Sequence, residues 1–392
     1  MRNPIATIGA PPAPAVNLEA EADLRCCGAL KDFWYAACLA KELRRDRPLA
    51  RTIFGTPLVL FRDEQRRPVA LLDRCLHRNA RLSAGAVIEG RLGCPYHGWL
   101  YDRSGRCVEV PSLGPSQRAA GLDAAACEAN GLSRSPAEVG CLPRFEALEQ
   151  DGLVYVFMGQ DAARARRPAF RVPYFGDRRW RVYFMVTRFP NAVTNVVENF
   201  MDVPHTAVVH RGWFRRPAQR EVPATVTREG GSVLVRYQEP RDALSGLGRL
   251  FEAGGATLEH TDHYFVPNVT RVDYRWGADS GFAITSQCTP VGPLESMVYT
   301  AIGYRLPVDL PGALVARAIR PLVRWYTRQV IRQDAQIMQV QREGLAHPGG
   351  GRFAGTEADL LHAYVESYRR WLLEGGEGAG PADESRQIVL WT

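Results

Sequence analysis

The chain has 392 residues, and its content of 46% hydrophobic and 23% charged residues predicts a globular protein with two packed domains. Lys and Arg number 49 against 42 Asp and Glu, and this formal charge of +7 is scattered, which excludes a basic nucleic-acid stripe and suggests an acidic partner. No apolar run reaches the about 20 residues of a membrane span, no signal-peptide pattern opens the chain, and nine Cys in so long a chain exclude a disulfide scaffold.

The N-terminal part of the chain divides into three predicted segments. Residues 1–20 are rich in Pro and Ala without hydrophobic periodicity, which predicts a disordered arm. Residues 21–48 are expected to carry a short amphipathic helix, at about Asp32–Leu43, that packs on the second domain. Residues 49–162 show apolar runs around polar turns and end in the buried-strand pattern Leu153–Met158, so we expect an all-β domain.

The second part of the chain, residues 163–392, mixes both types of secondary structure after a charged, Pro-punctuated boundary at Ala163–Pro173. Strands are predicted at Arg181–Phe189 and within Val222–Leu306, with a helical stretch between them. Two helices are expected to end the chain, at about Pro311–Arg342 and Glu357–Glu374. Strands followed by helices without strict alternation indicate an α+β domain with an antiparallel sheet.

The strongest motif in the chain pairs Cys75 and His77 with Cys94 and His97. Two thiolates and two imidazoles at short, matched spacings can close around a metal centre, either a structural zinc or a [2Fe–2S] cluster. Zinc fingers usually take both Cys from one turn and both His from another. Here each turn supplies one Cys and one His, which favours a cluster whose two irons differ in their ligands.

A second group of potential ligands lies in the predicted helix 191–209 and just beyond it, where His205 and His210 are five residues apart. On an ideal helix their side chains would point about 140° apart, so one ion can bind both only if the helix is broken, and Pro204 is a plausible cause. Asp202 lies three residues before His205 and could accept the proton of a metal-bound imidazole. Taken alone, such a His pair is more often structural than a ligand pair.

A third potential ligand, Asp334, lies on the apolar face of the predicted helix 311–342, between Val330 and Ile337. A buried carboxylate is costly unless a cation or a donor meets it, so Asp334 either pairs with an Arg or binds a metal. Two His and one carboxylate form the facial triad of non-haem Fe(II) oxygenases. A further pair, His260 and His263, is expected to lie on a strand and to point to opposite faces, which favours a pocket-lining or surface role over a metal site.

The first motif resembles a Rieske [2Fe–2S] domain, in which C-x-H is followed, here after sixteen residues, by C-x-x-H-G-W. The resemblance implies that Cys75 and Cys94 bind one iron and that His77 and His97 bind the other. Respiratory Rieske proteins add a disulfide whose positions hold Ala80 and Tyr96 here, and its absence implies the low-potential, ferredoxin or oxygenase type. The family often has Gly where this chain has Asn79, which also tolerates the left-handed conformation.

Both motifs together, over about residues 32–370, resemble the α-subunit of a Rieske non-haem iron oxygenase. The resemblance implies an N-terminal all-β Rieske domain followed by an α+β catalytic domain. It implies that His205, His210 and Asp334 bind a mononuclear Fe(II), with Asn199 near this iron. It also implies that Asp202 bridges His205 to His97 of a neighbouring subunit, commonly in a homotrimer.

The resemblance predicts a cytoplasmic terminal oxygenase that uses O₂ to hydroxylate or otherwise oxidise a small, cyclic organic substrate, with no nucleic acid or membrane as partner. Because no flavin or nicotinamide fingerprint is visible, electrons must come from a separate reductase or ferredoxin. Two alternatives stay open: a Rieske-type electron carrier or redox sensor without oxygenase activity, and a Cys₂His₂ zinc protein that binds partners. An electron carrier would need no residues beyond about Gly159, so the long second part of the chain favours the oxygenase.

Overall fold

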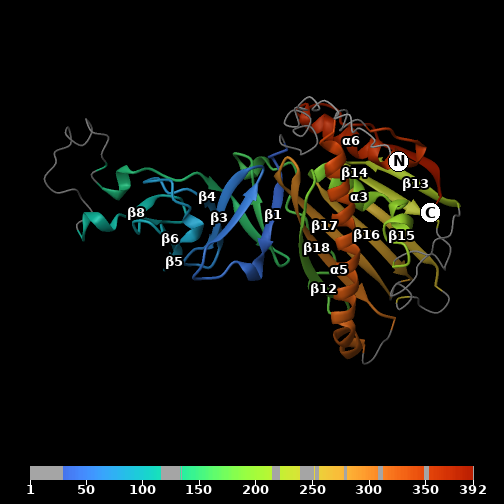
Figure 1. Ribbon diagram of the computed structural model, residues 1–392, viewed down its shortest axis with the longest axis horizontal. Helices are drawn as coiled ribbons and strands as arrows, with labels where there is room; N and C mark the ends of the chain where they lie inside the picture. Colours follow the sequence, from blue (N-terminus) through green and yellow to red (C-terminus); the bar gives the residue numbers. More distant parts are fainter. Residues whose placement is uncertain are drawn as a thin grey trace, which may run out of the picture.

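The computed structural model describes residues 30–115, 133, 135–213, 221–238, 251, 256–277, 280–307, 312–347 and 353–391. The predicted arm, residues 1–20, lies outside these residues. The described chain forms an N-terminal part of small antiparallel sheets and a C-terminal part built on one large antiparallel sheet (Figure 1). The predicted fold class, an all-β domain followed by an α+β domain with C-terminal helices, is therefore confirmed.

Three small sheets make up the N-terminal part, and every strand pair in them is antiparallel. The first has the order β1-β11-β10, with β1 at Trp34–Leu39, β11 at Leu153–Phe157 and β10 at Ala147–Gln150. The second has the order β2-β3-β4-β9, with Leu49–Ile53, Thr56–Arg62, Pro68–Leu72 and Arg144–Phe145. The third has the order β5-β6-β7-β8, with Ala86–Ile88, Arg91–Gly93, Leu100–Tyr101 and Cys107–Glu109. Short 3₁₀ helices lie at Ala40–Glu42, Leu82–Ala84, Pro111–Leu113, Pro136–Glu138 and Ala162–Arg164.

The helix predicted at Asp32–Leu43 is wrong, because strand β1 and one 3₁₀ turn occupy this segment. Residues 35–39 are all buried, and such a continuous apolar run fits a buried helix or a buried strand equally well. Pairing with β11 decides for the strand. The segment still contacts the large sheet: Thr289 donates a hydrogen bond to the backbone oxygen of Ala36, and Tyr299 donates one to that of Ala37.

The large sheet of the C-terminal part has the order β12-β18-β17-β16-β15-β14-β13-β19. In chain order its strands are Arg181–Phe189, Glu221–Glu229, Ser232–Tyr237, Leu258–Phe265, Val269–Trp276, Ser280–Gly292, Glu295–Arg305 and Glu384–Trp391. Helices α3 at Val193–Met201, α4 at His205–Val208, α5 at Gly312–Leu345 and α6 at Leu360–Leu373 complete this part, with a 3₁₀ turn at Glu357–Asp359. In Figure 1, α3, α5 and α6 lie over one face of the sheet. No helix of the described chain is both long and apolar enough to span a membrane.

The sequence analysis missed the last strand, β19, because it expected two helices to end the chain. β19 pairs with β13 along the edge of the large sheet. Its side chains alternate: Ile388 and Leu390 are buried, whereas Val389 and Trp391 are exposed. The sequence itself shows a continuous apolar run at these four positions, so the alternation is visible only in the structure.

Helix α3 is held against α5 by a buried hydrogen-bond network around Asn191, just before the helix begins. The Asn191 amide donates to the backbone oxygen of Met338 (2.9 Å) and to Gln341 (2.8 Å), and its oxygen accepts from Asn195 (2.8 Å). Asn191 is fully buried, so these bonds are shielded from water. The network fixes the position of α3, which carries Asn199, relative to α5, which carries Asp334.

Candidate functional site

The four residues of the first motif lie on two loops that turn back on themselves with the same pattern of backbone hydrogen bonds. Cys75 and His77 follow β4, and the Cys75 backbone amide donates to the Ala80 oxygen (2.9 Å). Cys94 and His97 lie between β6 and β7, and the Cys94 amide donates to the Trp99 oxygen (2.8 Å). In each loop one residue adopts the left-handed conformation, Asn79 with φ 57° and Gly98 with φ 71°. The expectation that Asn79 tolerates this conformation is confirmed.

The two loops bring their ligand atoms to one end of the N-terminal part. Both Cys are buried, and the rings of His77 and His97 lie 4.7 Å apart. The Nδ1 atom of His77 is buried, and within the described residues it has no hydrogen-bond partner. Burial lowers the pKa of His77, as do nearby His97 and Arg78, so the lone pair of its ring is available to a metal. This orphaned nitrogen, beside two buried thiols, fits a [2Fe–2S] cluster.

Tyr101, on strand β7, supports the first loop in a way that the sequence analysis missed. Its hydroxyl lies 3.2 Å from the Cys75 sulfur and accepts a hydrogen bond from the Leu76 backbone amide (3.1 Å). A Cys75 sulfur bound to a cluster would be a thiolate with no proton to give, so the Tyr101 hydroxyl would donate to it. Burial, together with Cys75, raises the pKa of Tyr101, so the hydroxyl keeps its proton.

Replacing Tyr101 with phenylalanine is expected to lower the reduction potential of a bound cluster by about 60 mV, since a hydrogen bond to a charged sulfur is worth about 1.4 kcal/mol. The bond stabilises the more negative, reduced state, so its loss favours the oxidised state. Redox titration of the visible absorption measures the shift. The matched control is Tyr96→Phe, which keeps the ring stacked on His97; equal potentials in the wild type and Tyr101→Phe would contradict the role.

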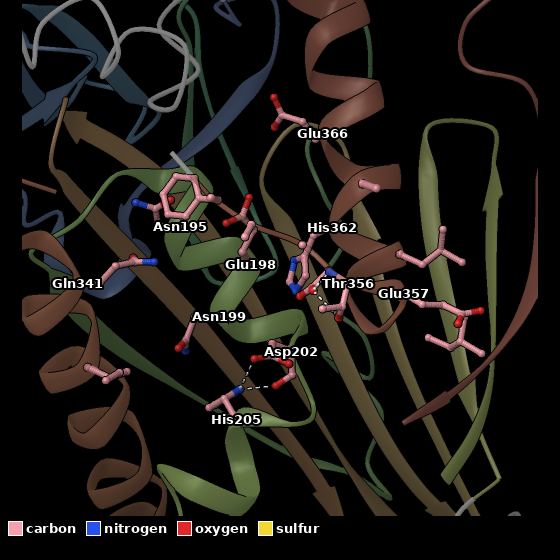
Figure 2. A pocket seen from close by; sticks show the side chains of 18 of the residues that line it. Asn195, Glu198, Asn199, Asp202, His205, Gln341, Thr356, Glu357, His362 and Glu366 are labelled. Atoms are coloured by element: carbon pink, nitrogen blue, oxygen red, sulfur yellow. Dashed lines mark hydrogen bonds and ion pairs between the residues drawn. The ribbon is translucent and has the colours of Figure 1, made fainter. Parts of the chain in front are cut away.

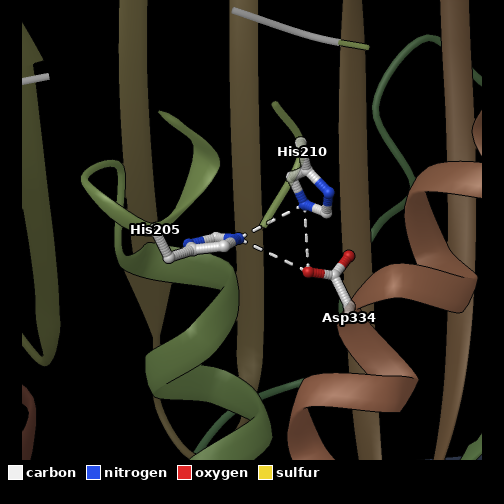
Figure 3. A group of neighbouring side chains, drawn as sticks. All are labelled: His205, His210 and Asp334. Carbon is white, nitrogen blue, oxygen red and sulfur yellow. Dashed lines mark hydrogen bonds and ion pairs between the residues drawn. The ribbon is translucent and has the colours of Figure 1, made fainter. Parts of the chain in front are cut away.

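The second site forms where the predicted helix 191–209 breaks. Helix α3 ends at Met201, Asp202 is extended (φ −89°, ψ 102°), and α4 begins at His205 after Pro204. A second interruption lies between the two His, because α4 ends at Val208. This end of α4 agrees with the expectation that one continuous helix could not aim both His at one point, whereas the break at Asp202–Pro204 precedes both. Figure 3 shows His205 on α4, His210 on the segment that follows it and Asp334 on α5, all pointing toward a common centre.

The ligand atoms of this group form a small triangle. The Nε2 atoms of His205 and His210 lie 3.3 Å apart, and the Asp334 Oδ1 atom is 3.4 Å from the first and 3.1 Å from the second. Three ligands that bind one ion at right angles with bonds of about 2.1 Å are about 3 Å apart. Among the described residues, these three are the group of His, Cys and carboxylates close enough to hold one ion. Their donor set and spacing fit the facial triad of a mononuclear iron site.

Neighbouring groups orient each member of the triad. The Asn199 amide donates to Asp334 Oδ1 (3.0 Å), and His210 Nδ1 donates to the Gln333 amide oxygen (2.9 Å). His205 Nδ1 donates to the backbone oxygen of Asp202. Both imidazoles therefore carry a proton on Nδ1, and on binding a metal each would present the Nε2 lone pair to it. Gln333 is a further residue that the sequence analysis missed.

Asp334 is the ionised member of the triad. Burial alone would raise the pKa of the Asp334 carboxyl, but hydrogen bonds with His205 and His210 outweigh it and hold the pKa at about 2. Burial alone would lower the pKa of His205, but its hydrogen bond to Asp334 and the charge of that carboxylate raise it. The carboxylate is thus an ionised acceptor with two imidazoles beside it. Because neither partner is an Arg, the alternative of an Asp334–Arg pair does not describe this site.

The Asp202 side chain contacts the site less directly than its backbone does. Its Oδ2 atom lies 3.9 Å from His205 Nδ1, so the backbone oxygen, not the carboxylate, is the near acceptor. The side chain is 35% exposed and faces a depression of about 870 Å³ (Figure 2). Burial raises the pKa of Asp202 although His205 opposes it. Asp202 thus lies between His205 and an open surface.

A smaller cavity of about 110 Å³ adjoins the opposite side of the triad. Besides the triad it is lined by Phe200, Asp202, Val203, Thr206, His260, Asp262, Thr270, Val272, Tyr274, Ile284, Ser286, Thr300, Thr327, Val330 and Ile331. His260 is buried on strand β15, whereas His263 points to the other face of the sheet. The two His do not meet, as expected, and His260 is the one that lines a pocket.

Both parts of the chain match known protein families. Residues 33–127 match the Rieske [2Fe–2S] domain, and residues 192–367 match the vanillate O-demethylase oxygenase C-terminal domain. The oxygenase component of dicamba O-demethylase from Stenotrophomonas maltophilia is 36% identical over 275 residues, which cover 69% of this chain and 72% of that protein. The chain belongs to the Rieske non-haem iron oxygenases. Since the second match covers the part of this oxygenase that an isolated carrier would lack, the family match favours the oxygenase over the carrier and the zinc protein.

Two further comparisons agree with the family. The crystal structure of dicamba monooxygenase bound to dicamba superimposes on this Rieske oxygenase with a TM-score of 0.71, at 22% identity, covering 88% of this chain and 98% of the other. The chloroplast protein TIC 55 of Arabidopsis thaliana is 26% identical over 360 residues. The chain spans 60% of the length of that relative. The superposition on dicamba monooxygenase shows that the two proteins share a fold, and both candidate sites lie within that fold.

Proposed function

We propose that this chain is the terminal component of an oxygenase system that oxidises a small, cyclic organic substrate with O₂. The observation that carries the proposal is the triangle of His205, His210 and Asp334 beside a cavity with mostly apolar walls, in a chain that also has the Rieske ligand set. When bound, the [2Fe–2S] cluster would supply single electrons, and a mononuclear Fe(II) would activate O₂ for insertion into the substrate.

The chain's own residues have distinct roles in this proposal. His205, His210 and Asp334 would hold the iron, and the Asn199 amide keeps the Asp334 carboxylate in place through its hydrogen bond. Cys75, His77, Cys94 and His97 would hold the cluster. The cavity beside the triad would bind the substrate and exclude bulk water from it, because most of its walls are apolar.

Monooxygenation, with demethylation as the first reaction to test, is the chemistry that we propose. The supporting observation is the match of residues 192–367 to a domain of vanillate O-demethylase, together with the similarity to dicamba O-demethylase. A panel of small methoxylated, N-methylated and unsubstituted ring compounds, incubated with the purified chain, a ferredoxin and its reductase, tests it. We expect O₂ uptake and product with at least one compound; no uptake by iron-loaded protein with any compound or donor would contradict the activity.

Electrons are proposed to come from a separate, acidic ferredoxin or reductase, because the chain carries a formal charge of +7.

We also propose that the Rieske domain comprises residues 49–162 and that the catalytic domain comprises residues 163–392. A cytoplasmic location is also proposed. It is supported by the absence of disulfides among the described Cys, of which Cys75 and Cys94 are reserved for the cluster.

A homotrimer, in which each cluster serves the iron of a neighbouring subunit, completes the proposal. The cluster loops lie beside β6 and the triad beside α3, which Figure 1 places in opposite parts of the molecule. His97 is exposed on its loop, near the exposed basic side chains of Arg78 and Arg81. The depression in front of Asp202 is lined by five carboxylates and one Arg, namely Glu198, Asp202, Glu357, Asp359, Glu366 and Arg386. A basic loop of one subunit therefore complements the acidic depression of the next.

Complementation between two inactive variants tests the transfer between subunits. Cys94→Ser should lack the cluster and Asp334→Ala should lack the mononuclear iron, so neither homo-oligomer should turn over. Co-expressed chains should recover part of the wild-type rate, because a mixed oligomer places an intact cluster next to an intact iron site. Mixed oligomers that form, carry both metals and stay inactive would contradict transfer between subunits.

A further inference from the structure

An acidic side chain that the proposed metal sites do not use lies on the wall of the small cavity. Asp262 is in the middle of strand β15, is 1% exposed and lines the same cavity as the triad. His260, two residues earlier, shares its face of the strand and lines the cavity with it. The cavity thus has a metal-binding end, formed by helices, and a polar wall, formed by the sheet.

The Asp262 carboxylate is held in a fixed position. Its Oδ1 atom is 3.1 Å from His260 Nε2, and its Oδ2 atom accepts a hydrogen bond from the Tyr237 hydroxyl (3.0 Å). The His260 ring is stacked between Tyr237 and Tyr274, with ring centroids 4.4 Å and 4.0 Å away. A carboxylate offers about four lone-pair positions, so two donors leave it able to accept another from a ligand.

The charges around the cavity favour a ligand that donates hydrogen bonds or carries positive charge. Three carboxylates line it, those of Asp202, Asp262 and Asp334. Of the described residues that line the cavity, none is Arg or Lys. A bound Fe(II) with neutral imidazoles would leave the cavity with about one negative charge. A carboxylate ligand would find no Arg or Lys on the described wall, and the one His outside the triad, His260, already pairs with Asp262. An ammonium or N–H group would meet the Asp262 carboxylate.

The size of the cavity sets the scale of the ligand. Its volume is about 110 Å³, and a protein cavity of roughly 150 Å³ accommodates benzene. The apolar side chains of Val272, Ile284, Val330 and Ile331 line it and can pack against a ring. Because this volume is below the one that accommodates benzene, it excludes ligands larger than a single ring, and a single ring enters with small shifts of the lining side chains.

We propose that Asp262 determines substrate specificity: it selects single-ring substrates that carry an amine or another N–H donor, and it rejects carboxylates. The inference rests on the proposed function, since it assigns a substrate class to the cavity beside the proposed iron site. His260 and Tyr237 are positioning residues, because they act through the Asp262 carboxylate. Asp262 would hold the ring of the substrate in one orientation, so that the same ring atom always faces the triad.

Binding of benzylamine and benzoate to the purified, metal-loaded protein tests the selection. The two probes share a ring and differ in the sign of their charge. Titration calorimetry without O₂ should give an affinity for benzylamine at least about 10-fold higher than for benzoate, because a charge-assisted hydrogen bond is gained by only one of them. In Asp262→Asn this preference should disappear or reverse, because an amide accepts and donates without charge.

Two further variants test whether the charge of Asp262, and not a change in the surrounding structure, causes the preference for benzylamine. Glu259→Gln makes the same change of charge on the same strand, but on an exposed side chain, and should keep the preference. Tyr237→Phe removes one donor to Asp262 while keeping its charge, and should also keep the preference for the amine.

Benzoate binding as tightly as benzylamine in the wild type would overturn the inference. An unchanged preference in Asp262→Asn, or an equal loss in Glu259→Gln, would overturn it as well. If the proposed function is wrong, the protein will lack mononuclear iron or will take up no O₂, and these are separate measurements. The binding measurement requires no turnover, so the two failures are distinguishable.

Discussion

Asp334→Ala is expected to remove the mononuclear iron, to leave the Rieske cluster in place and to lower turnover on the order of 10³-fold or more. Asp334 is the only carboxylate of the triangle, and its loss leaves two imidazoles with no charge to balance the ion. Losing several kcal/mol of metal binding and activation corresponds to such a factor. Iron per chain, the visible spectrum of the cluster and the rate of O₂ uptake measure the three effects.

Glu343→Ala is the matched control, because Glu343 is an exposed carboxylate on the same helix, α5. It should retain iron and rate. Full iron content in Asp334→Ala would contradict the assignment of this residue as a ligand, and loss of the cluster as well would indicate a damaged fold.

Asp202→Asn is expected to keep both metals but to slow the delivery of electrons to the iron site by about 100-fold, the upper range for a residue that supports a metal ligand. The substitution keeps the backbone oxygen that accepts from His205, so it removes only the charge that faces the depression. Reoxidation of the reduced cluster during a single turnover, followed by its absorption, measures the rate.

Glu374→Gln, an exposed charge at the end of α6, serves as the control and should leave the rate unchanged. The prediction separates two roles of Asp202. If the side chain only held the helix break, thermal stability and iron content would fall together with the rate. An unimpaired single turnover in Asp202→Asn would refute the bridge between subunits.

The candidate metal ligands could be identified from the sequence because most of them lie close together in short segments. Cys75 and Cys94 each lie within three residues of a His, and nothing but a metal centre readily explains two such pairs. Asp334 could be found because a carboxylate on an apolar helix face needs a partner, and it is indeed 5% exposed. Pro204 marks the start of α4, as its sequence position suggested, but the interruption between His205 and His210 is the end of α4 at Val208, for which Pro204 gave no signal.

Residues that act through tertiary contacts were not predictable. Tyr101 reaches Cys75 from a strand 26 positions along the chain, and Gln333 reaches His210 across 123 positions. Nothing in their own neighbourhoods distinguishes them from other polar residues. Such partners depend on how sheets and helices pack, which local patterns do not encode.

The two errors of secondary structure have different physical causes. Strand β1 is buried on both faces, so its apolar run carries no period, and pairing with β11 decided its conformation. Strand β19 ends in a short apolar run of four residues at the end of the sequence, and its pairing with the open edge at β13 shows that it is a strand. The first was ambiguous in principle, whereas the second was overlooked.

The central claim is that one chain carries both a Rieske cluster and a mononuclear iron site. Quantification of iron and acid-labile sulfide in the purified protein, with its visible and electron paramagnetic resonance spectra, tests it most directly. The account predicts brown protein with about three irons and about two sulfides per chain, and a Rieske-type signal on reduction. Colourless protein that contains zinc, or brown protein that cannot take up iron beyond the cluster, would contradict it.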